Sequence, residues 1–217
     1  MPRVRLERPS RRRERAFLAA VRRSLRLHGV FVEAPGSHDE YAEYLRRARR
    51  STQASFLVVD RDSDELVGVV NVNDIVRDSR CSGSLGYYAF EPYAGRGYMH
   101  EALRLVVAQA FGKLKLHRLE ASIQPTNSRS IRLVESLGFT LEGTSRRYLK
   151  IRGRWRDHQR WALLAEDWRA AARSTACDAL SARRRVHTSS TTSTANVKTS
   201  SAAAAIESPS VNASSSP

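Results

Sequence analysis

The sequence contains little cysteine and no long hydrophobic run, and both absences exclude classes of protein. Its two cysteines, Cys81 and Cys177, are far apart in the chain, so there is neither a disulfide framework nor a zinc-binding spacing. No stretch approaches the roughly 18 apolar residues of a transmembrane helix. The N-terminus is charged from Arg3 onward and lacks the apolar segment of a secretory signal. We therefore expect a cytoplasmic protein with reduced thiols and no membrane partner.

Several motifs of catalytic sites are also missing. The P-loop pattern G-x-x-x-x-G-K-[ST] does not occur. His100 and Glu101 begin like the zinc-protease motif H-E-x-x-H, but Arg104 stands where the second histidine is required. No nucleophile elbow is present. The sequence thus predicts no metal site and no catalytic triad.

Acidic residues are scarce relative to basic ones, with 37 Lys and Arg against 22 Asp and Glu and a formal net charge of +15. Two interpretations stay open. The arginines either form solvated helix faces and a charged tail, or attract polyanions such as ribosomal RNA and the phosphates of a cofactor. No signature of sequence-specific nucleic-acid binding accompanies them. This charge is densest at Arg8, Arg11, Arg12, Arg13, Arg15, Arg22, Arg23, Arg26 and 183–185.

The composition changes near residue 170. Beyond it lie low-complexity stretches such as Ser189-Ser190-Thr191-Thr192-Ser193, which lack the aromatic side chains that a core needs. We expect residues 172–217 to be a disordered tail. Residues 3–168 are then expected to form a single domain of ordinary size.

Hydrophobic periodicity in residues 3–168 predicts a mixed α/β (α+β) architecture. A strand, two helices, an antiparallel meander, a helix-strand-helix segment and a closing hairpin together predict a mixed sheet with helices packed on it. Asn127 is expected to cap the last of these helices and Gly138 to end it. The predicted strands are 4–6, 56–60, 66–72, 84–90, 117–123, 139–141, 148–151 and 155–164, and the predicted helices are 13–27, 41–50, 99–110 and 128–137.

The turn Gly95-Arg96-Gly97 lies directly before a predicted helix. A helix N-terminus carries unpaired N–H groups and favours negative charge, and glycine lets the backbone approach a phosphate closely. Alone, this pattern is weak. A Rossmann fingerprint would need a third small residue where His100 stands, and its ribose acid would be Glu120, but the preceding strand ends an antiparallel meander rather than starting a parallel unit. The turn therefore indicates a phosphate site of another kind.

Five segments follow one another between Tyr87 and Trp161, namely 95–102, 116–121, 127–130, 137–143 and 153–158. Taken together, they resemble the GNAT acetyltransferase superfamily. Within it they resemble the branch that acetylates N-terminal (alanine) amines of ribosomal proteins. The resemblance implies a GNAT-like acyl-CoA N-acyltransferase fold, acetyl-CoA as cosubstrate, and direct transfer of the acetyl group to a primary amine.

The resemblance also implies roles for individual residues. Backbone amides of the turn and the first helical residues would hold the CoA pyrophosphate, and the strand end before the turn would pair with pantetheine and polarise the acetyl carbonyl. Asn127 would hold the pantetheine arm, and Ser130 would protonate the departing thiolate. The implied cofactor-binding residues are Ala89, Phe90, Gly95, Arg96, Gly97, Tyr98, Met99, His100, Asn127 and Ser130.

Three departures from the family pattern stand out. Ala94 occupies a place for Gln or Arg, and Met99 a place for Gly or Ala. The hairpin segment Tyr148-Leu149-Lys150 lacks the acid that serves some members as base. The pattern therefore does not assign the general base. Glu91 at the strand end is the leading candidate. The alternative is that Glu91 is an ordinary solvated acid. An α-amine with a pKa near 8 is neutral in on the order of a tenth of molecules at pH 7, so a strong base is not required.

The acceptor that we expect is the N-terminal amine of a protein, plausibly ribosomal. Two alternatives stay open. One is acetylation of a small amine. The positive charge of the protein argues against this alternative where the amine is cationic. The other is a non-catalytic CoA-binding module that docks on RNA or protein.

Overall fold

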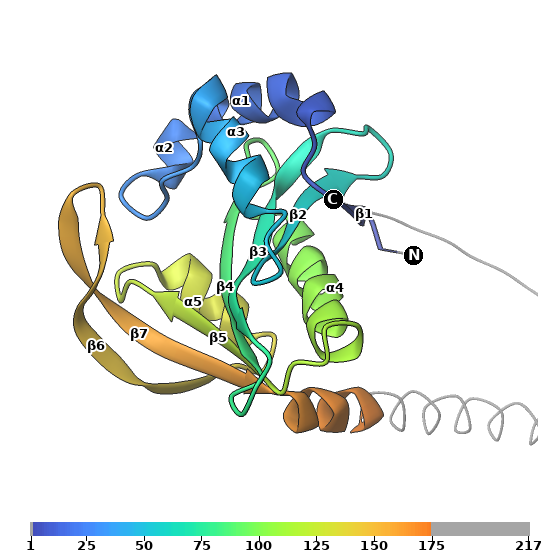
Figure 1. Ribbon diagram of the computed structural model, residues 1–217, viewed down its shortest axis with the longest axis vertical. Helices are drawn as coiled ribbons and strands as arrows, with labels where there is room; N and C mark the ends of the chain where they lie inside the picture. Colours follow the sequence, from blue (N-terminus) through green and yellow to red (C-terminus); the bar gives the residue numbers. More distant parts are fainter. Residues whose placement is uncertain (1, 175–217) are drawn as a thin grey trace, which may run out of the picture. The chain divides into compact units, whose positions relative to one another are not determined.

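The computed structural model describes residues 2–174 (Figure 1). They form a seven-stranded sheet of order β1-β2-β3-β4-β5-β7-β6, in which β4 and β5 pair parallel and the other neighbours pair antiparallel. This confirms the predicted mixed sheet. The expected disordered tail, 172–217, is wrong for residues 172–174, which belong to the final helix, and lies outside the described residues from 175 onward. The strands are β1 Val4–Glu7, β2 Ala54–Asp60, β3 Leu66–Val76, β4 Ser82–Ala89, β5 Arg118–Ile123, β6 Thr140–Ile151 and β7 Arg154–Leu164.

The helices cover both faces of the sheet. On β2, Val58 packs in one core cluster with residues of α4 and α5, whereas Leu57 and Val59 pack in a second cluster with residues of α1 and α3. Alternate side chains of a strand point to opposite faces, so α4 and α5 lie on one side of the sheet and α1 and α3 on the other (Figure 1). The helical elements are η1 Arg11–Arg13, α1 Glu14–Arg23, α2 Leu25–His28, α3 His38–Arg47, α4 Tyr98–Gly112, α5 Ser128–Glu135 and a final helix from 165.

The helix predicted over 13–27 is wrong in one respect, because it breaks at Ser24 into α1 and α2. The Ser24 hydroxyl donates to the Ala20 carbonyl at 2.7 Å and accepts the N–H of Glu91 at 2.9 Å. A buried serine that bonds backbone in this way competes with the helical pattern. The break turns α2 toward the end of β4.

Helix termini follow local sequence signals. Ser37 and Glu40 form a capping box, so α3 begins earlier than the predicted 41. Asn127 caps α5, as predicted: its side chain accepts the N–H of Ser130 at 3.2 Å. Gly138 ends α5 with φ 87°, while the Phe139 N–H donates to the Val134 carbonyl at 3.1 Å, as in a Schellman motif.

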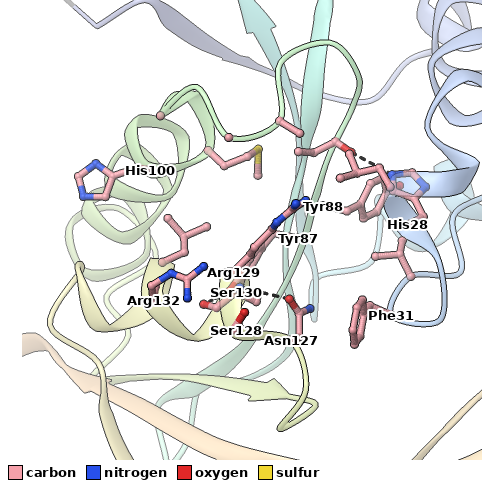
Figure 2. Close-up of a pocket in the computed structure, with 18 of the residues that line it drawn as sticks. His28, Phe31, Tyr87, Tyr88, His100, Asn127, Ser128, Arg129, Ser130 and Arg132 are labelled. Atoms are coloured by element: carbon pink, nitrogen blue, oxygen red, sulfur yellow. Dashed lines mark hydrogen bonds between the residues drawn. The ribbon is translucent and has the colours of Figure 1, made fainter.

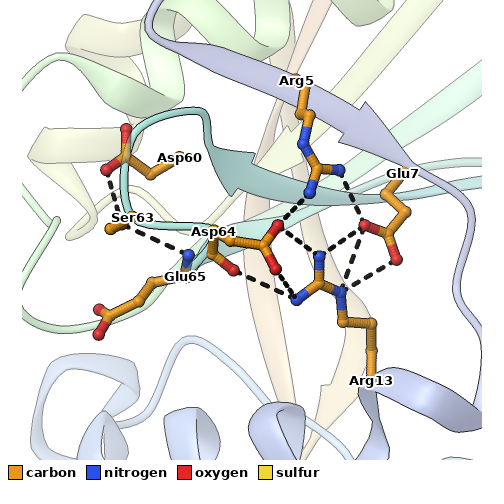
Figure 3. Close-up of polar contacts among 7 residues, drawn as sticks. All are labelled: Arg5, Glu7, Arg13, Asp60, Ser63, Asp64 and Glu65. Atoms are coloured by element: carbon orange, nitrogen blue, oxygen red, sulfur yellow. Dashed lines mark hydrogen bonds and ion pairs between the residues drawn. The ribbon is translucent and has the colours of Figure 1, made fainter.

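A charge cluster joins β1 and η1 to the turn between β2 and β3 (Figure 3). Arg13 donates to Glu7 at 2.8 Å and to Asp64 at 2.8 Å, and Arg5 donates to Glu7 at 2.9 Å and contacts Asp64. The Arg13 side chain is only 14% exposed. Part of the basic N-terminal segment is thus structural, because it is paired with acids of the same domain.

The feature that positions the site is a separation of two strands. The parallel pairing of β4 and β5 runs from Ser82↔Arg118 to Leu85↔Ala121. β4 then continues beside β3 to Ala89, whereas β5 continues beside β7 to Ile123. Backbone groups of β4 beyond Leu85 that point away from β3 are therefore left without a partner strand.

Candidate active site

A cavity of about 620 Å³ lies where β4 and β5 separate (Figure 2). One side is formed by the turn before α4 and the first residues of that helix, and the opposite side by α2 and the residues after it. α5 contributes the remaining side with residues 126–130, 132 and 133. The cavity therefore joins segments that are distant in sequence.

The glycine turn lies at this cavity and has the backbone geometry expected of an anion cradle. Gly95 and Gly97 have φ values of 77° and 81°, in the left-handed region that glycine favours, and both line the cavity. Gly97 is the N-cap of α4, and the first intrahelical bond runs from the Glu101 N–H to the Gly97 carbonyl at 3.2 Å. The amides before Glu101 have no intrahelical partner. Together with the helix dipole they can bind a negative group.

Two residues of the predicted phosphate segment, Arg96 and Tyr98, do not line the cavity. The Tyr98 ring packs edge-on against Tyr93 at 5.2 Å and lies under the Arg3 guanidinium at 4.4 Å. The Arg96 N–H donates to the Tyr93 carbonyl at 3.4 Å, and the Arg96 carbonyl accepts from Arg3 at 3.3 Å. Of the two residues, only Tyr98 keeps a backbone N–H without an intrahelical partner, at the start of α4.

Met99, which departs from the small-residue pattern, is accommodated by a second glycine. A Cβ on Gly68 of β3 would lie 2.6 Å from the Met99 sulfur and 2.6 Å from the Tyr88 carbonyl oxygen. Gly68 thus gives room for the Met99 side chain against the sheet. This pairing could not be seen in the sequence, because the two residues come from separate elements.

At the end of β4 the structure separates the three predicted residues. Ala89 lines the cavity. Phe90 does not: its N–H donates to the Val67 carbonyl at 2.7 Å, and its fully buried ring belongs to the core shared with α1 and α3. Strand alternation is the reason, since neighbouring residues direct their backbone groups to opposite sides. Glu91 also does not line the cavity, and its backbone is held by Ser24 and Arg23.

The two predicted residues of α5 do line the cavity, and a tyrosine joins them. The Ser130 hydroxyl lies 2.6 Å from the hydroxyl of Tyr87 on β4. Burial raises the pKa of Tyr87 to about 12, so its hydroxyl keeps its proton at neutral pH. Asn127 uses its side-chain oxygen for the cap, and its amide nitrogen remains a donor. Tyr87 was missed because a tyrosine in an apolar strand resembles a core residue.

His28 is the second residue that sequence analysis missed. It is the last residue of α2, only 2% exposed, and it lines the cavity. Its Nε2 lies 2.9 Å from the Ala89 carbonyl oxygen, and its ring packs edge-on against Tyr88 at 5.3 Å. Burial lowers the pKa of His28 below 6.5. A lone histidine in an arginine-rich segment gives no sequence signal of this placement.

The charged side chains at the cavity are the arginines Arg129 and Arg132 of α5 (Figure 2). His100 lines it from α4. Within the described residues, no Asp or Glu lines the cavity. The cavity therefore suits an anionic ligand better than a polycation.

Two further findings concern the described residues alone. No group of three or more His, Cys, Asp or Glu residues in 2–174 could hold a metal ion. No helix in the same range is long and apolar enough to cross a bilayer.

Comparison with known proteins adds sequence relatives. A family model described as an acetyltransferase (GNAT) domain matches residues 3–140, more than half of the chain. A probable N-acetyltransferase, YjcK, of Bacillus subtilis (strain 168) is 39% identical over 137 residues, which is 63% of this chain and 76% of that protein. The [ribosomal protein uS5]-alanine N-acetyltransferase of Escherichia coli (strain K12) is 39% identical over 113 residues, which is 52% of this chain and 58% of that enzyme.

Solved structures share the fold. Mycobacterium smegmatis RimJ in complex with CoA-disulfide superposes with a TM-score of 0.69 at 24% identity, covering 76% of this chain and 83% of that one. Spermidine N-acetyltransferase from Vibrio cholerae in complex with CoA and spermine gives a TM-score of 0.66 at 23% identity, covering 76% and 98%. At these identities the likeness extends to the fold alone.

Proposed function

The chain belongs to the GNAT acetyltransferase family, and from that premise we propose that it acetylates the N-terminal amine of a protein, with a ribosomal protein as the first acceptor to test. The observation that carries this choice is the cavity, whose charged lining is positive and whose described wall contains no acid. A neutral or acidic peptide end fits such a wall better than a polyamine does. The uS5-alanine relative supports the same acceptor class.

The residues at the cavity suit acetyl-CoA, which supplies an activated acetyl thioester when bound. We assign the pyrophosphate to the amides at Gly95, Gly97 and the first turn of α4, because a left-handed glycine turn at a helix N-terminus offers donors to an anion. We drop Arg96, whose N–H donates to the Tyr93 carbonyl at 3.4 Å, and keep the N–H of Tyr98, which has no intrahelical partner. Met99 and His100 belong to the same cradle.

The opened edge of β4 is assigned to the pantetheine arm and the acetyl group. Ala89 and Tyr87 direct their backbone groups away from β3, into the space that β5 has left. We retain Ala89 for this role and drop Phe90, whose N–H is used inside the sheet. Asn127 offers its side-chain amide to the same arm.

Ser130 and Tyr87 are proposed to protonate the sulfur that departs. Their hydroxyls share a hydrogen bond of 2.6 Å, so a proton given up by Ser130 can be replaced from Tyr87. The acceptor amine attacks directly within a complex of enzyme, cofactor and acceptor. We drop Glu91 as the base, because it does not line the cavity.

An acceptor panel tests this proposal. Acetyl-CoA turnover is measured with an alanine-initiated peptide, spermidine and free amino acids, and N-terminal acetylation of ribosomal proteins is compared by mass spectrometry with and without the enzyme. We expect the highest kcat/KM with the peptide and a change in the ribosomal pattern. Spermidine as the best acceptor, with an unchanged ribosomal pattern, would instead establish the small-amine alternative that the Vibrio cholerae fold neighbour suggests.

The non-catalytic alternative makes a different prediction. A CoA-binding module would gain about 2.7 kcal/mol of stability at a CoA concentration near 100 times Kd, yet turn over no amine. The absence of an acid in 148–150 is the feature that favours it. Turnover with any member of the panel rules it out.

That the basic surface attracts RNA stays a prediction, and so does a cytoplasmic location. The support for RNA lies in the β6–β7 hairpin, where Trp155 is 60% exposed, Lys150 is its cross-strand partner and Arg154 its neighbour. Exposed aromatics among cations can stack on unpaired bases. Salt-dependent binding of an RNA oligonucleotide, measured by fluorescence anisotropy, checks this.

A further inference from the structure

We propose that His28 accepts the proton that the acceptor nitrogen loses during acetyl transfer, an inference that rests on the proposed function. His28 lines the cavity on the side of α2, next to the opened end of β4 where the acetyl group is assigned (Figure 2). No other residue is assigned as the general base, because the hairpin segment 148–150 lacks an acid and Glu91 does not line the cavity. His28 fills that place by geometry.

The hydrogen bond to β4 fixes which ring nitrogen is basic. His28 Nε2 lies 2.9 Å from the Ala89 carbonyl oxygen, and a carbonyl only accepts, so Nε2 carries the hydrogen. The lone pair of the neutral ring is then on Nδ1. Nδ1 is thus the ring atom left to accept a proton, on a residue that lines the cavity.

The surroundings keep this ring neutral and held in place. Tyr88 and Phe90 of the β4 end pack against it, with ring centroids 5.3 and 6.0 Å away. Burial lowers the pKa of His28, the bond to Ala89 opposes that change, and the positive charge of Arg152 lowers the pKa again. The pKa of Tyr88 is raised far above its usual value by burial, so Tyr88 stays neutral. The ring is thus a neutral proton acceptor at pH 7.

A weak base is suited to this step. The neutral acceptor nitrogen attacks the carbonyl carbon, so a C–N bond forms and the C–S bond breaks. The nitrogen becomes positive as the new bond forms, and is then a much stronger acid than a free ammonium. Its proton passes to Nδ1 of His28 and on to solvent, while the sulfur takes a proton from the Ser130–Tyr87 pair, which regains one from solvent.

The other titratable groups of the described cavity wall are less suited. Burial raises the pKa of Tyr87 to about 12, and its hydroxyl is bonded to Ser130. The guanidinium groups of Arg129 and Arg132 are hydrogen-bond donors with no lone pair to offer. His100 lies on α4, across the cavity from His28 (Figure 2).

Two substitutions of His28 distinguish a role as proton acceptor from a role as anchor of the Ala89 carbonyl. His28→Gln offers an amide N–H to the Ala89 carbonyl but has no titratable atom, whereas His28→Ala removes both functions. Each is assayed with acetyl-CoA and an alanine-initiated hexapeptide, or with spermidine if the peptide is not acetylated. We expect kcat to fall about 100-fold in His28→Gln. The Kd for CoA should stay within about 3-fold of the wild-type value, which corresponds to under about 1 kcal/mol of binding free energy.

The pH profile is the readout that an anchor would not change. At pH values below the pKa of His28, log(kcat/KM) of the wild type should rise with pH with a slope of about 2, because His28 and the acceptor amine must both lose a proton, and with a slope of about 1 in His28→Gln. Imidazole should restore part of the activity of His28→Ala and none of that of His28→Gln, whose side chain fills the site.

Several outcomes overturn the proposal. Wild-type kcat in His28→Gln would mean that His28 only anchors Ala89, and a slope of about 2 retained in that variant would assign the titration to another group. If the variants no longer bind CoA, the wild-type profile decides, and a slope of about 1 that persists at pH values below the pKa of His28 is contrary to the proposal. If the wild type acetylates neither acceptor, both proposals fall. An active wild type with unaffected variants removes the role of His28 alone.

Discussion

The two opposite sides of the cavity are built from different parts of the polypeptide. On the α4 side the groups that we propose to bind the cofactor are backbone amides at a turn where Gly95 and Gly97 have positive φ. On the α2 side they are side chains, of which His28 is held by one hydrogen bond to Ala89. Where the binding groups are backbone amides, substitutions that add side-chain atoms should reduce function. Where they are side chains, substitutions that remove atoms should reduce function. The same cavity should therefore respond in opposite ways to substitution at its two sides.

The largest expected effect comes from adding a carboxylate to the glycine side. Gly95→Asp should raise the Kd for CoA about 100-fold or more, equivalent to about 2.8 kcal/mol, because a negative side chain repels the pyrophosphate. Gly153→Asp is a matched control: Gly153 has φ 76° against 77° for Gly95, and a Cβ meets nothing within 4 Å at either position. Calorimetric titration should show an effect at Gly95 alone. Equal weakening in both variants would contradict the cradle.

Removing a hydroxyl from α5 should lower the rate without weakening the cofactor. Ser130→Ala is expected to reduce kcat about 10- to 100-fold, because the sulfur loses its proton donor. Ser128→Ala is the control, since Ser128 also lines the cavity but has no bond to Tyr87. Steady-state kinetics with saturating acetyl-CoA measure both. A similar loss in the two variants would remove the assigned role of Ser130.

Substitutions of Asn127 distinguish its role as a helix cap from a contact with the cofactor. Asn127→Ala should cost about 1 kcal/mol of unfolding free energy through the lost cap, whereas Asn127→Asp keeps an acceptor oxygen and should keep the stability. Both lack the amide donor, so both should raise the KM for acetyl-CoA. Urea unfolding and steady-state kinetics check the two effects. An unchanged KM in Asn127→Asp would leave Asn127 as a cap only.

The smallest effect concerns the α2 side and pH. The folded-state pKa of His28 is lowered from 6.5, so below about pH 6.5 the unfolded chain binds a proton that the folded chain does not. The free energy of unfolding should thus fall more between pH 7 and 5 in the wild type than in His28→Gln. The pKa of His38 is raised by Glu14 and works in the opposite sense, but it is common to both proteins. Parallel pH curves for the two proteins would contradict the burial of a neutral His28.

Local sequence signals predicted most of the elements. The Asn127 cap, the Gly138 terminus and the glycine turn all depend on residues within one helical turn of each other, so their geometry is set locally. The helix over 13–27 was predicted without a break because the contact that breaks it, from Ser24 to Glu91, spans distant residues. The same contact orients α2 and with it His28.

By itself, the sequence determined most of the strands and helices, the glycine turn before α4 and the resemblance to the family. Periodicity, caps and contiguous motifs are properties of neighbouring residues, and they persist whatever surrounds them. Only the tertiary structure decided which groups share the cavity: it brought in His28 and Tyr87 and left out Phe90 and Glu91. The physical reason is that strand alternation and the separation of β4 from β5 fix where each group points, and both depend on pairing between segments far apart in the chain.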